Sequence, residues 1–156
     1  EAQMKRLICG LVGIFLLSVG GAFLTWWVTG PPDRRVACDS GSLEAGEICL
    51  ADVLKWEKES ILWVDARTRA LWKKNGAEGS ILLTDDNAED YDELEGNFVE
   101  AAFREGDPYH RIVIYCGDKG CGSSKAIAAA IREKFAEMMG FEVYVLYGGW
   151  KALAAE

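Results

Sequence analysis

Two cysteines frame a glycine-rich loop in the last third of the chain. Cys116 directly follows the apolar run Ile112–Tyr115, and Cys121 lies within the loop segment Gly117–Ser123 that comes next. The thiolate form of cysteine is a nucleophile, and two neighbouring thiols can form a disulfide. The spacing therefore indicates either nucleophilic or redox chemistry at Cys116. A buried structural cysteine beside an ordinary turn is the alternative interpretation.

The loop itself has the composition of an anion-binding turn. Its glycines allow the backbone to curl so that several N–H groups point inward, and the following helix would add the partial positive charge of its N-terminus. Such a field lowers the pKa of a thiol and stabilises a thiolate, a persulfide or a bound oxyanion. The residues predicted to form this cradle around Cys116 are Gly117, Asp118, Lys119, Gly120, Cys121, Gly122 and Ser123.

Short apolar runs alternate with helical patterns through the rest of the chain, and this predicts the elements that position Cys116. We expect strands at Glu47–Leu50, Ile61–Val64, Ser80–Leu83, Ile112–Tyr115 and Val143–Leu146. We expect helices from a cap at Asp52 to about Glu59, over Thr68–Asn75, Ala88–Arg104 and Ser124–Met138, and a last turn over Trp150–Ala154. This order is typical of an α/β fold with a central, mostly parallel sheet and helices on both faces. Ligands bind such sheets at the carboxyl ends of the strands, where Cys116 lies.

Composition excludes several classes of function. The formal net charge is -8, and no run of Lys or Arg carries interleaved aromatic residues, so a nucleic-acid partner is not expected. The five cysteines do not follow zinc-ligand spacing, and His110 is the only histidine. We therefore expect no metal and no cofactor.

The N-terminal segment Leu7–Val28 is almost entirely apolar and uncharged. As a helix it would be about 33 Å long, which matches the core of a bilayer, and Trp26 and Trp27 would lie at an interface. We expect a membrane anchor, or an uncleaved signal segment, over residues 1–28. The alternative interpretation is a signal peptide that is cleaved off. Residues 29–46 are then a linker, and residues 47–156 form one domain.

The orientation of the anchor is nearly balanced in charge. Lys5 and Arg6 precede the apolar segment, and Arg34 and Arg35 follow it. We favour a domain outside the cytoplasm, on the periplasmic side, where Cys38 and Cys49 could pair in a disulfide. On the cytoplasmic side, which is not excluded, both would be free thiols.

Three segments in the right order resemble the rhodanese family. "ILWVDAR", Ile61–Arg67, is similar to the family's strand followed by Asp-x-Arg. "NGAEGSILL", Asn75–Leu83, is similar to its "GHIPGAI" segment. "IVIYCGDKGCGSSKA" followed by "GFEVYVLYGGWKAL" is similar to its active-site loop, helix and closing strand. The likeness covers roughly Cys49–Leu153, and its strength lies in the combination of the segments.

The resemblance implies that Cys116 is the nucleophile that accepts sulfur. It also implies that Asp65 and Arg67 support the loop, although Arg67 could equally reach the substrate. Gly76 stands where the family usually has His, and the loop is about one residue longer than usual. No Arg occurs between Cys116 and Arg132, which argues against the phosphatase chemistry found on related folds.

Three functions follow from these observations. The first is a rhodanese-type sulfurtransferase, in which Cys116 accepts sulfane sulfur from thiosulfate or a persulfide and passes it to a thiol acceptor. The second is a thiol–disulfide redox protein in which Cys121 is the resolving thiol, unless Cys121 merely fills space in the loop. The third is a non-catalytic docking module that is anchored to a membrane and has a membrane protein as its partner.

Overall fold

The computed structural model describes residues 36–85, 88–103, 111–117, 122–135 and 142–155, together with residues 4, 13–15, 18–21, 27 and 140. The chain separates into two compact units, Glu1–Arg34 and Arg35–Glu156. Within the residues that are described, no helix has both the length and the apolar character needed to cross a membrane. Most of the predicted anchor Leu7–Val28 lies outside the described residues, so the anchor stays a prediction.

The second unit is built on one five-stranded sheet in which every pair of neighbouring strands is parallel. The strands are β1 (Glu47–Ile48), β2 (Ile61–Asp65), β3 (Ile81–Leu82), β4 (Arg111–Tyr115) and β5 (Glu142–Leu146), in the order β1-β5-β4-β2-β3. The α/β class with a parallel sheet is therefore confirmed. The central strand β4 pairs with β2 on one side and β5 on the other, with Tyr115 opposite Asp65.

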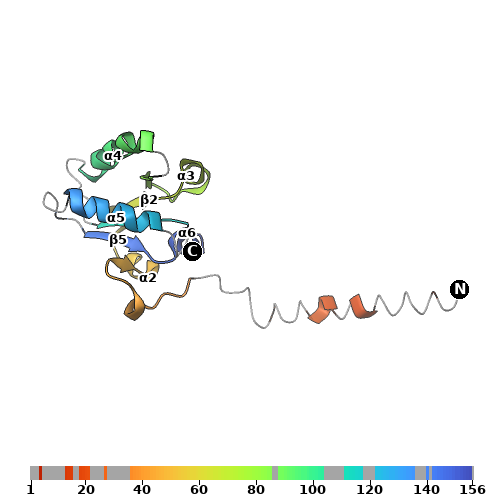
Figure 1. Ribbon diagram of the computed structural model, residues 1–156. Coiled ribbons are helices and arrows are strands. Elements are labelled where there is room, and N and C mark those ends of the chain that lie inside the picture. The colour runs from red at the N-terminus through yellow and green to blue at the C-terminus, as the bar shows by residue number, and fades with distance from the viewer. Residues whose placement is uncertain are drawn as a thin grey trace. The chain divides into compact units, whose positions relative to one another are not determined.

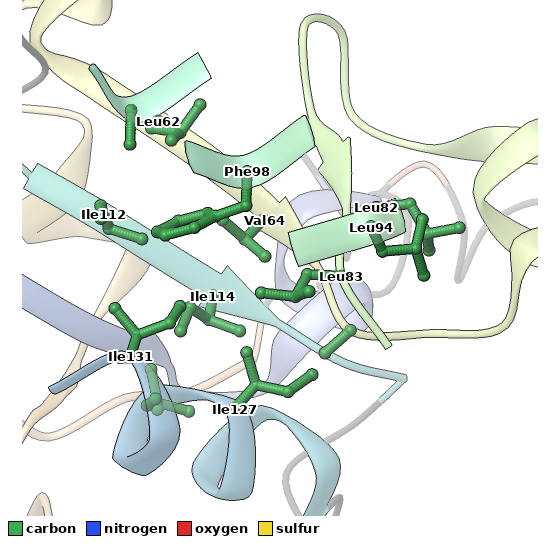
Figure 2. Packing of buried hydrophobic residues seen from close by; sticks show 14 of the residues in the cluster. Leu62, Val64, Leu82, Leu83, Leu94, Phe98, Ile112, Ile114, Ile127 and Ile131 are labelled. Atoms are coloured by element: carbon green, nitrogen blue, oxygen red, sulfur yellow. The ribbon is translucent and has the colours of Figure 1, made fainter. Parts of the chain in front are cut away.

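Two hydrophobic clusters cover the two faces of this sheet. Helices α4 (Ala88–Ala102) and α5 (Gly122–Phe135) pack on one face, and Figure 2 shows Phe98 of α4 between Val64 and Ile112. Helices α2 (Leu50–Val53) and α6 (Gly149–Leu153) pack on the other. Helix α3 (Arg69–Asn75) follows β2 in Figure 1. Because successive strand residues point to opposite faces, Ile114 and Tyr115 of β4 belong to different clusters.

Helix α2 is the element for which the prediction was wrong. Its N-cap is Cys49, whose carbonyl accepts from the N–H groups of Asp52 and Val53, so Asp52 lies inside the first turn. The Asp52 carboxylate instead accepts from Lys55 and Ser40. The chain does not continue as one helix to Glu59, because the Ser60 hydroxyl donates to the Glu57 carbonyl and a short 3-10 turn, Lys58–Ser60, forms there.

The remaining helices differ from prediction only at their ends. Helix α3 begins after Thr68, whose hydroxyl accepts from the N–H of Leu71 and caps the helix. Helix α5 begins at Gly122, two residues before the predicted start, and is described to Phe135. Residues 136–139, which the prediction placed in the same helix, lie outside the described residues.

Candidate functional site

Cys116 lies at the carboxyl end of the central strand and is 6% exposed. The N–H of Trp150 donates to the Cys116 carbonyl at 2.6 Å, and the N–H of Ala66 donates to the Tyr115 carbonyl at 2.8 Å. These bonds come from α6 on one side and from the residue after β2 on the other. They fix the direction in which the chain leaves β4, and with it the position of the Cys116 side chain.

The start of α5 supplies a helix N-terminus a few residues after Cys116. Of the predicted cradle, Gly117 continues directly from Cys116, and Gly122 and Ser123 form the first residues of α5. Ser124 of the same turn is buried. Asp118, Lys119, Gly120 and Cys121 lie outside the described residues, so the cradle they would form stays a prediction.

The sulfur of Cys116 takes part in a disulfide bond. A second disulfide joins Cys38 to Cys49 across 11 residues of sequence, with the Cα atoms 5.8 Å apart. Cys49 is buried and Cys38 is half-buried.

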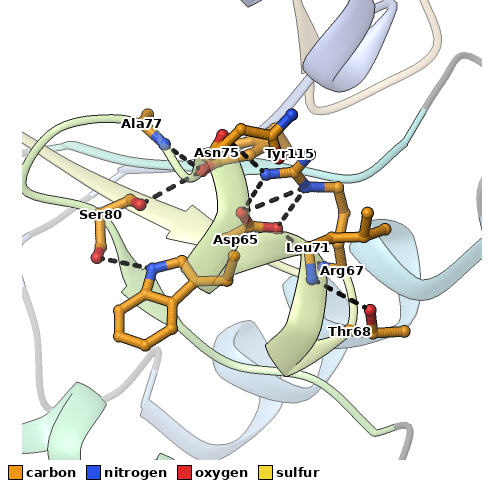
Figure 3. Close-up of polar contacts among 9 residues, drawn as sticks. Asp65, Arg67, Thr68, Leu71, Asn75, Ala77, Ser80 and Tyr115 are labelled. Atoms are coloured by element: carbon orange, nitrogen blue, oxygen red, sulfur yellow. Dashed lines mark hydrogen bonds and ion pairs between the residues drawn. The ribbon is translucent and has the colours of Figure 1, made fainter.

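Asp65 and Arg67 form a buried ion pair beside the site (Figure 3). Nε of Arg67 donates to Oδ1 of Asp65 at 2.9 Å, and one terminal nitrogen donates to Oδ2 at 2.7 Å. The Arg67 backbone N–H also donates to Oδ1 of Asp65. The other terminal nitrogen donates to the Asn75 side chain at 3.2 Å. The guanidinium is thus held at the junction of β2 and α3.

Two aromatic rings lie against the Arg67 guanidinium, and their centres are 6.0 Å from each other. Its central carbon lies 4.3 Å from the centre of the Trp150 ring and 5.5 Å from that of Tyr115. Burial opposes the positive charge, but the hydrogen bonds and the attraction of Asp65 outweigh it and raise the pKa of Arg67. The donors of Arg67 are directed to Asp65 and Asn75, and its planar face lies against Trp150. This arrangement favours the bracing role over the substrate-binding role.

The hydroxyl of Tyr115 ties the segment after α3 to β4. It accepts from the N–H of Ala77 at 2.9 Å and donates to the Ser80 hydroxyl at 3.2 Å. Burial raises the pKa of Tyr115 above its usual range. Sequence reasoning did not identify Tyr115 as part of the site. The signal was its place one residue before Cys116, which in a strand directs it to the opposite face.

No group of acidic, cysteine or histidine side chains in the described ranges could hold a metal ion. His110 and most of the loop lie outside those ranges. The acidic run that begins at Asp85 leads into α4, where Glu95 pairs with Lys134 of α5.

The model of the rhodanese-like domain matches residues 50–156. No curated protein is significantly similar to the chain. Among solved structures, the N-terminal domain of a candidate ATP/GTP binding protein from Clostridium difficile 630 is 21% identical, with a TM-score of 0.45, over 69% of this chain and 95% of that one. The BH2092 protein from Bacillus halodurans is 24% identical, with a TM-score of 0.42, over 67% of each chain.

Proposed function

We propose that this chain, which belongs to the rhodanese-like domain family, is a sulfurtransferase with Cys116 as the sulfur carrier. The observation that supports it is the place of Cys116, at the carboxyl end of the central strand and directly before the turn into α5. A cysteine in that position is held by the strand, and the helix N-terminus stabilises negative charge close to it.

The reaction has two steps. In the first, the Cys116 thiolate attacks the outer sulfur of thiosulfate, the S–S bond of the donor breaks, and sulfite leaves with the electron pair. A persulfide donor reacts in the same way and releases its thiolate. In the second, the thiolate of an acceptor attacks the outer sulfur of the Cys116 persulfide, which regenerates the Cys116 thiolate and forms the acceptor persulfide.

The intact mass of the reduced chain before and after donor treatment tests this proposal. We expect one sulfur atom to be gained with thiosulfate or a low-molecular-weight persulfide and to be lost on addition of cyanide. Cys116→Ser should gain none. Cys121→Ser is the matched control, since it removes a loop thiol and keeps the carrier. A gain of sulfur by Cys116→Ser, or none by the parent, would reject the assignment.

A second function is favoured by the disulfide at Cys116. In a thiol–disulfide redox protein, two thiols of the chain reduce a substrate disulfide to its two thiols and are themselves oxidised to a disulfide, and exchange with two thiols of a reductant restores them. Cys121 is the proposed resolving thiol. Mild oxidation should remove two hydrogen atoms from the parent at this site. The same loss in Cys121→Ala would exclude Cys121 from the pair.

The third function, a docking module without catalysis, becomes the leading one if neither sulfur uptake nor reversible oxidation of Cys116 is found. Its partner would be a membrane protein.

Placement outside the cytoplasm, with Leu7–Val28 as a membrane anchor, is part of the proposal. Support comes from the Cys38–Cys49 disulfide, because such bonds persist in oxidising compartments.

A further inference from the structure

A short arm, residues 36–46, precedes the residues that the family model matches and belongs to the same compact unit as the site. Its first described residue, Val36, packs on the cluster that contains Trp150. Val36 also approaches Gly148 so closely that a Cβ on Gly148 would lie 2.7 Å from Cγ1 of Val36. The arm therefore lies directly against the turn that leads into α6.

That turn is tied to the site by its backbone. Gly148 and Gly149 have left-handed φ angles of 81° and 55°, a conformation that glycine adopts without strain. The next residue, Trp150, donates its N–H to the Cys116 carbonyl and stacks its ring on Arg67. A displacement of the turn would thus move one contact at the end of β4 and one with Arg67, just after β2.

The Cys38–Cys49 disulfide holds the arm in this position. Cys38 lies two residues after Val36, and Cys49 is the buried N-cap of α2. The Ser40 hydroxyl adds a hydrogen bond to Asp52 of the same helix at 3.2 Å. The far end of the arm is held separately, by a bond from the Val145 N–H to the Gly46 carbonyl and by an ion pair of Glu44 with Lys125. Without the disulfide, the Ser40–Asp52 hydrogen bond would be left to hold the part of the arm next to Val36 near α2.

We propose that Val36, held by the Cys38–Cys49 disulfide, is a positioning residue for Cys116 and acts through the Gly148–Trp150 turn. The inference rests on the proposed function only in requiring that Cys116 is a reactive thiol. It assigns to the arm an effect on the reactivity of Cys116 as well as a contribution to stability.

The test uses the full chain in a Cys9→Ser/Cys121→Ser background. Of the five cysteines, only Cys38, Cys49 and Cys116 then remain, so Cys116 can be studied as a thiol while the Cys38–Cys49 disulfide is intact. The measurement is the rate of Cys116 alkylation by iodoacetamide as a function of pH, with the intact mass reporting a single modification. The midpoint of this profile gives the pKa of the thiol.

Four variants in this background separate positioning from stability. We expect Val36→Ala and Cys38→Ser/Cys49→Ser to raise the alkylation midpoint by about 0.5 pH units, because the loosened turn aligns the site less well. Val36→Thr, which keeps the shape of valine, should restore the midpoint. Val53→Ala is the matched control, since Val53 is a fully buried valine of the same cluster in α2. It should lower the melting temperature and leave the midpoint unchanged.

The outcomes also separate this inference from the proposed function. Midpoints within about 0.2 pH units of the background in both Val36→Ala and Cys38→Ser/Cys49→Ser would overturn the inference. An equal shift in Val53→Ala would do the same, because the effect would then follow stability alone. Sulfur uptake from thiosulfate is measured on the same samples. If the background takes up no sulfur while the midpoints shift as expected, the sulfurtransferase assignment fails and the positioning role stands.

Discussion

At the scale of single residues, the buried Asp65–Arg67 pair is the contact whose geometry depends most on the identity of the side chain. Arg67 uses both the direction and the planarity of its guanidinium, which lysine does not have. We expect Arg67→Lys to lower the free energy of unfolding by about 2–3 kcal/mol, less than the ~3–5 kcal/mol for removing one partner of a buried pair, because lysine keeps a positive charge. Urea denaturation measures this loss.

Arg69→Lys is the control for that substitution. Arg69 pairs with Asp90 at 3.5 Å, and the two side chains are 40% and 44% exposed, against 4% and 0% for Arg67 and Asp65. Exposed pairs contribute little, so the change in stability should be under about 0.5 kcal/mol. Equal losses in the two variants would contradict the bracing role of Arg67.

Tyr115 gives the site a defined response to alkaline pH. Its pKa is raised in the folded chain, chiefly by burial, so the folded state favours the neutral hydroxyl. This contribution to stability is complete below the pKa of the unfolded chain, near 10, and is lost as pH rises through the higher folded pKa. We expect Tyr115→Phe to be less stable than the parent by about 1–2 kcal/mol at pH 7, because the Ala77 N–H and Ser80 hydroxyl lose their partner.

The difference in stability between Tyr115→Phe and the parent should then shrink above about pH 10. Only the parent has a hydroxyl at position 115 that ionises there, and its ionisation lowers the stability of the parent. Thermal unfolding from pH 7 to pH 11 measures it. A difference that stays constant over this range would show that ionisation of Tyr115 is not linked to folding.

At the scale of elements, Gly148 in the turn before α6 can be compared with Gly96, a glycine within a helix. Gly148 has a left-handed φ, and a Cβ there would meet Val36, whereas Gly96 lies within α4 with open space around it. We expect Gly148→Ala to destabilise the chain by at least about 1 kcal/mol. Gly96→Ala should stabilise it by about 0.5–1 kcal/mol, since alanine is the better helix former. Melting temperatures that move in the same direction for both would contradict this account.

The elements that the sequence predicted well are those with a strong local signal. Continuous apolar runs marked β2, β4 and β5, and Thr68 marked the start of α3. Helix α2 was misplaced because Asp52 looked like a cap, while the actual cap is Cys49. Cys49 caps the helix with its backbone alone, without a side-chain hydrogen bond, and a backbone cap leaves no pattern in the sequence.

At the scale of the whole molecule, some parts of the site follow from local sequence patterns, and others depend on the assembled sheet. The position of Cys116 could be predicted, because a nucleophile at a strand end before a glycine-rich turn is a local pattern. The sequence left the role of Arg67 open between bracing and substrate binding. The contacts of Arg67 with the Trp150 and Tyr115 rings, and the packing of Val36 on Gly148, depend on the strand order β1-β5-β4-β2-β3. Only the assembled sheet brings these residues together.

The net charge of -8 predicts how the chain responds to an anionic donor. If thiosulfate is the donor, as proposed, long-range repulsion should slow its approach, and salt should screen this repulsion as the Debye length falls from about 30 Å at 0.01 M to about 8 Å at 0.15 M. We expect kcat/KM for thiosulfate to rise about 2–5-fold over this range. Alkylation of Cys116 by uncharged iodoacetamide is the control and should be insensitive to salt.

A fall in kcat/KM with salt would contradict this prediction and would mean that a local cation dominates the encounter. Lys119 is the one basic residue between Cys116 and Ser123, so Lys119→Gln identifies that source. If the fall in kcat/KM with salt disappears in Lys119→Gln, attraction of the donor by this lysine outweighs repulsion by the rest of the chain. If kcat/KM of the parent instead rises with salt, and rises more steeply in Lys119→Gln, the overall charge governs the encounter and Lys119 only weakens the repulsion.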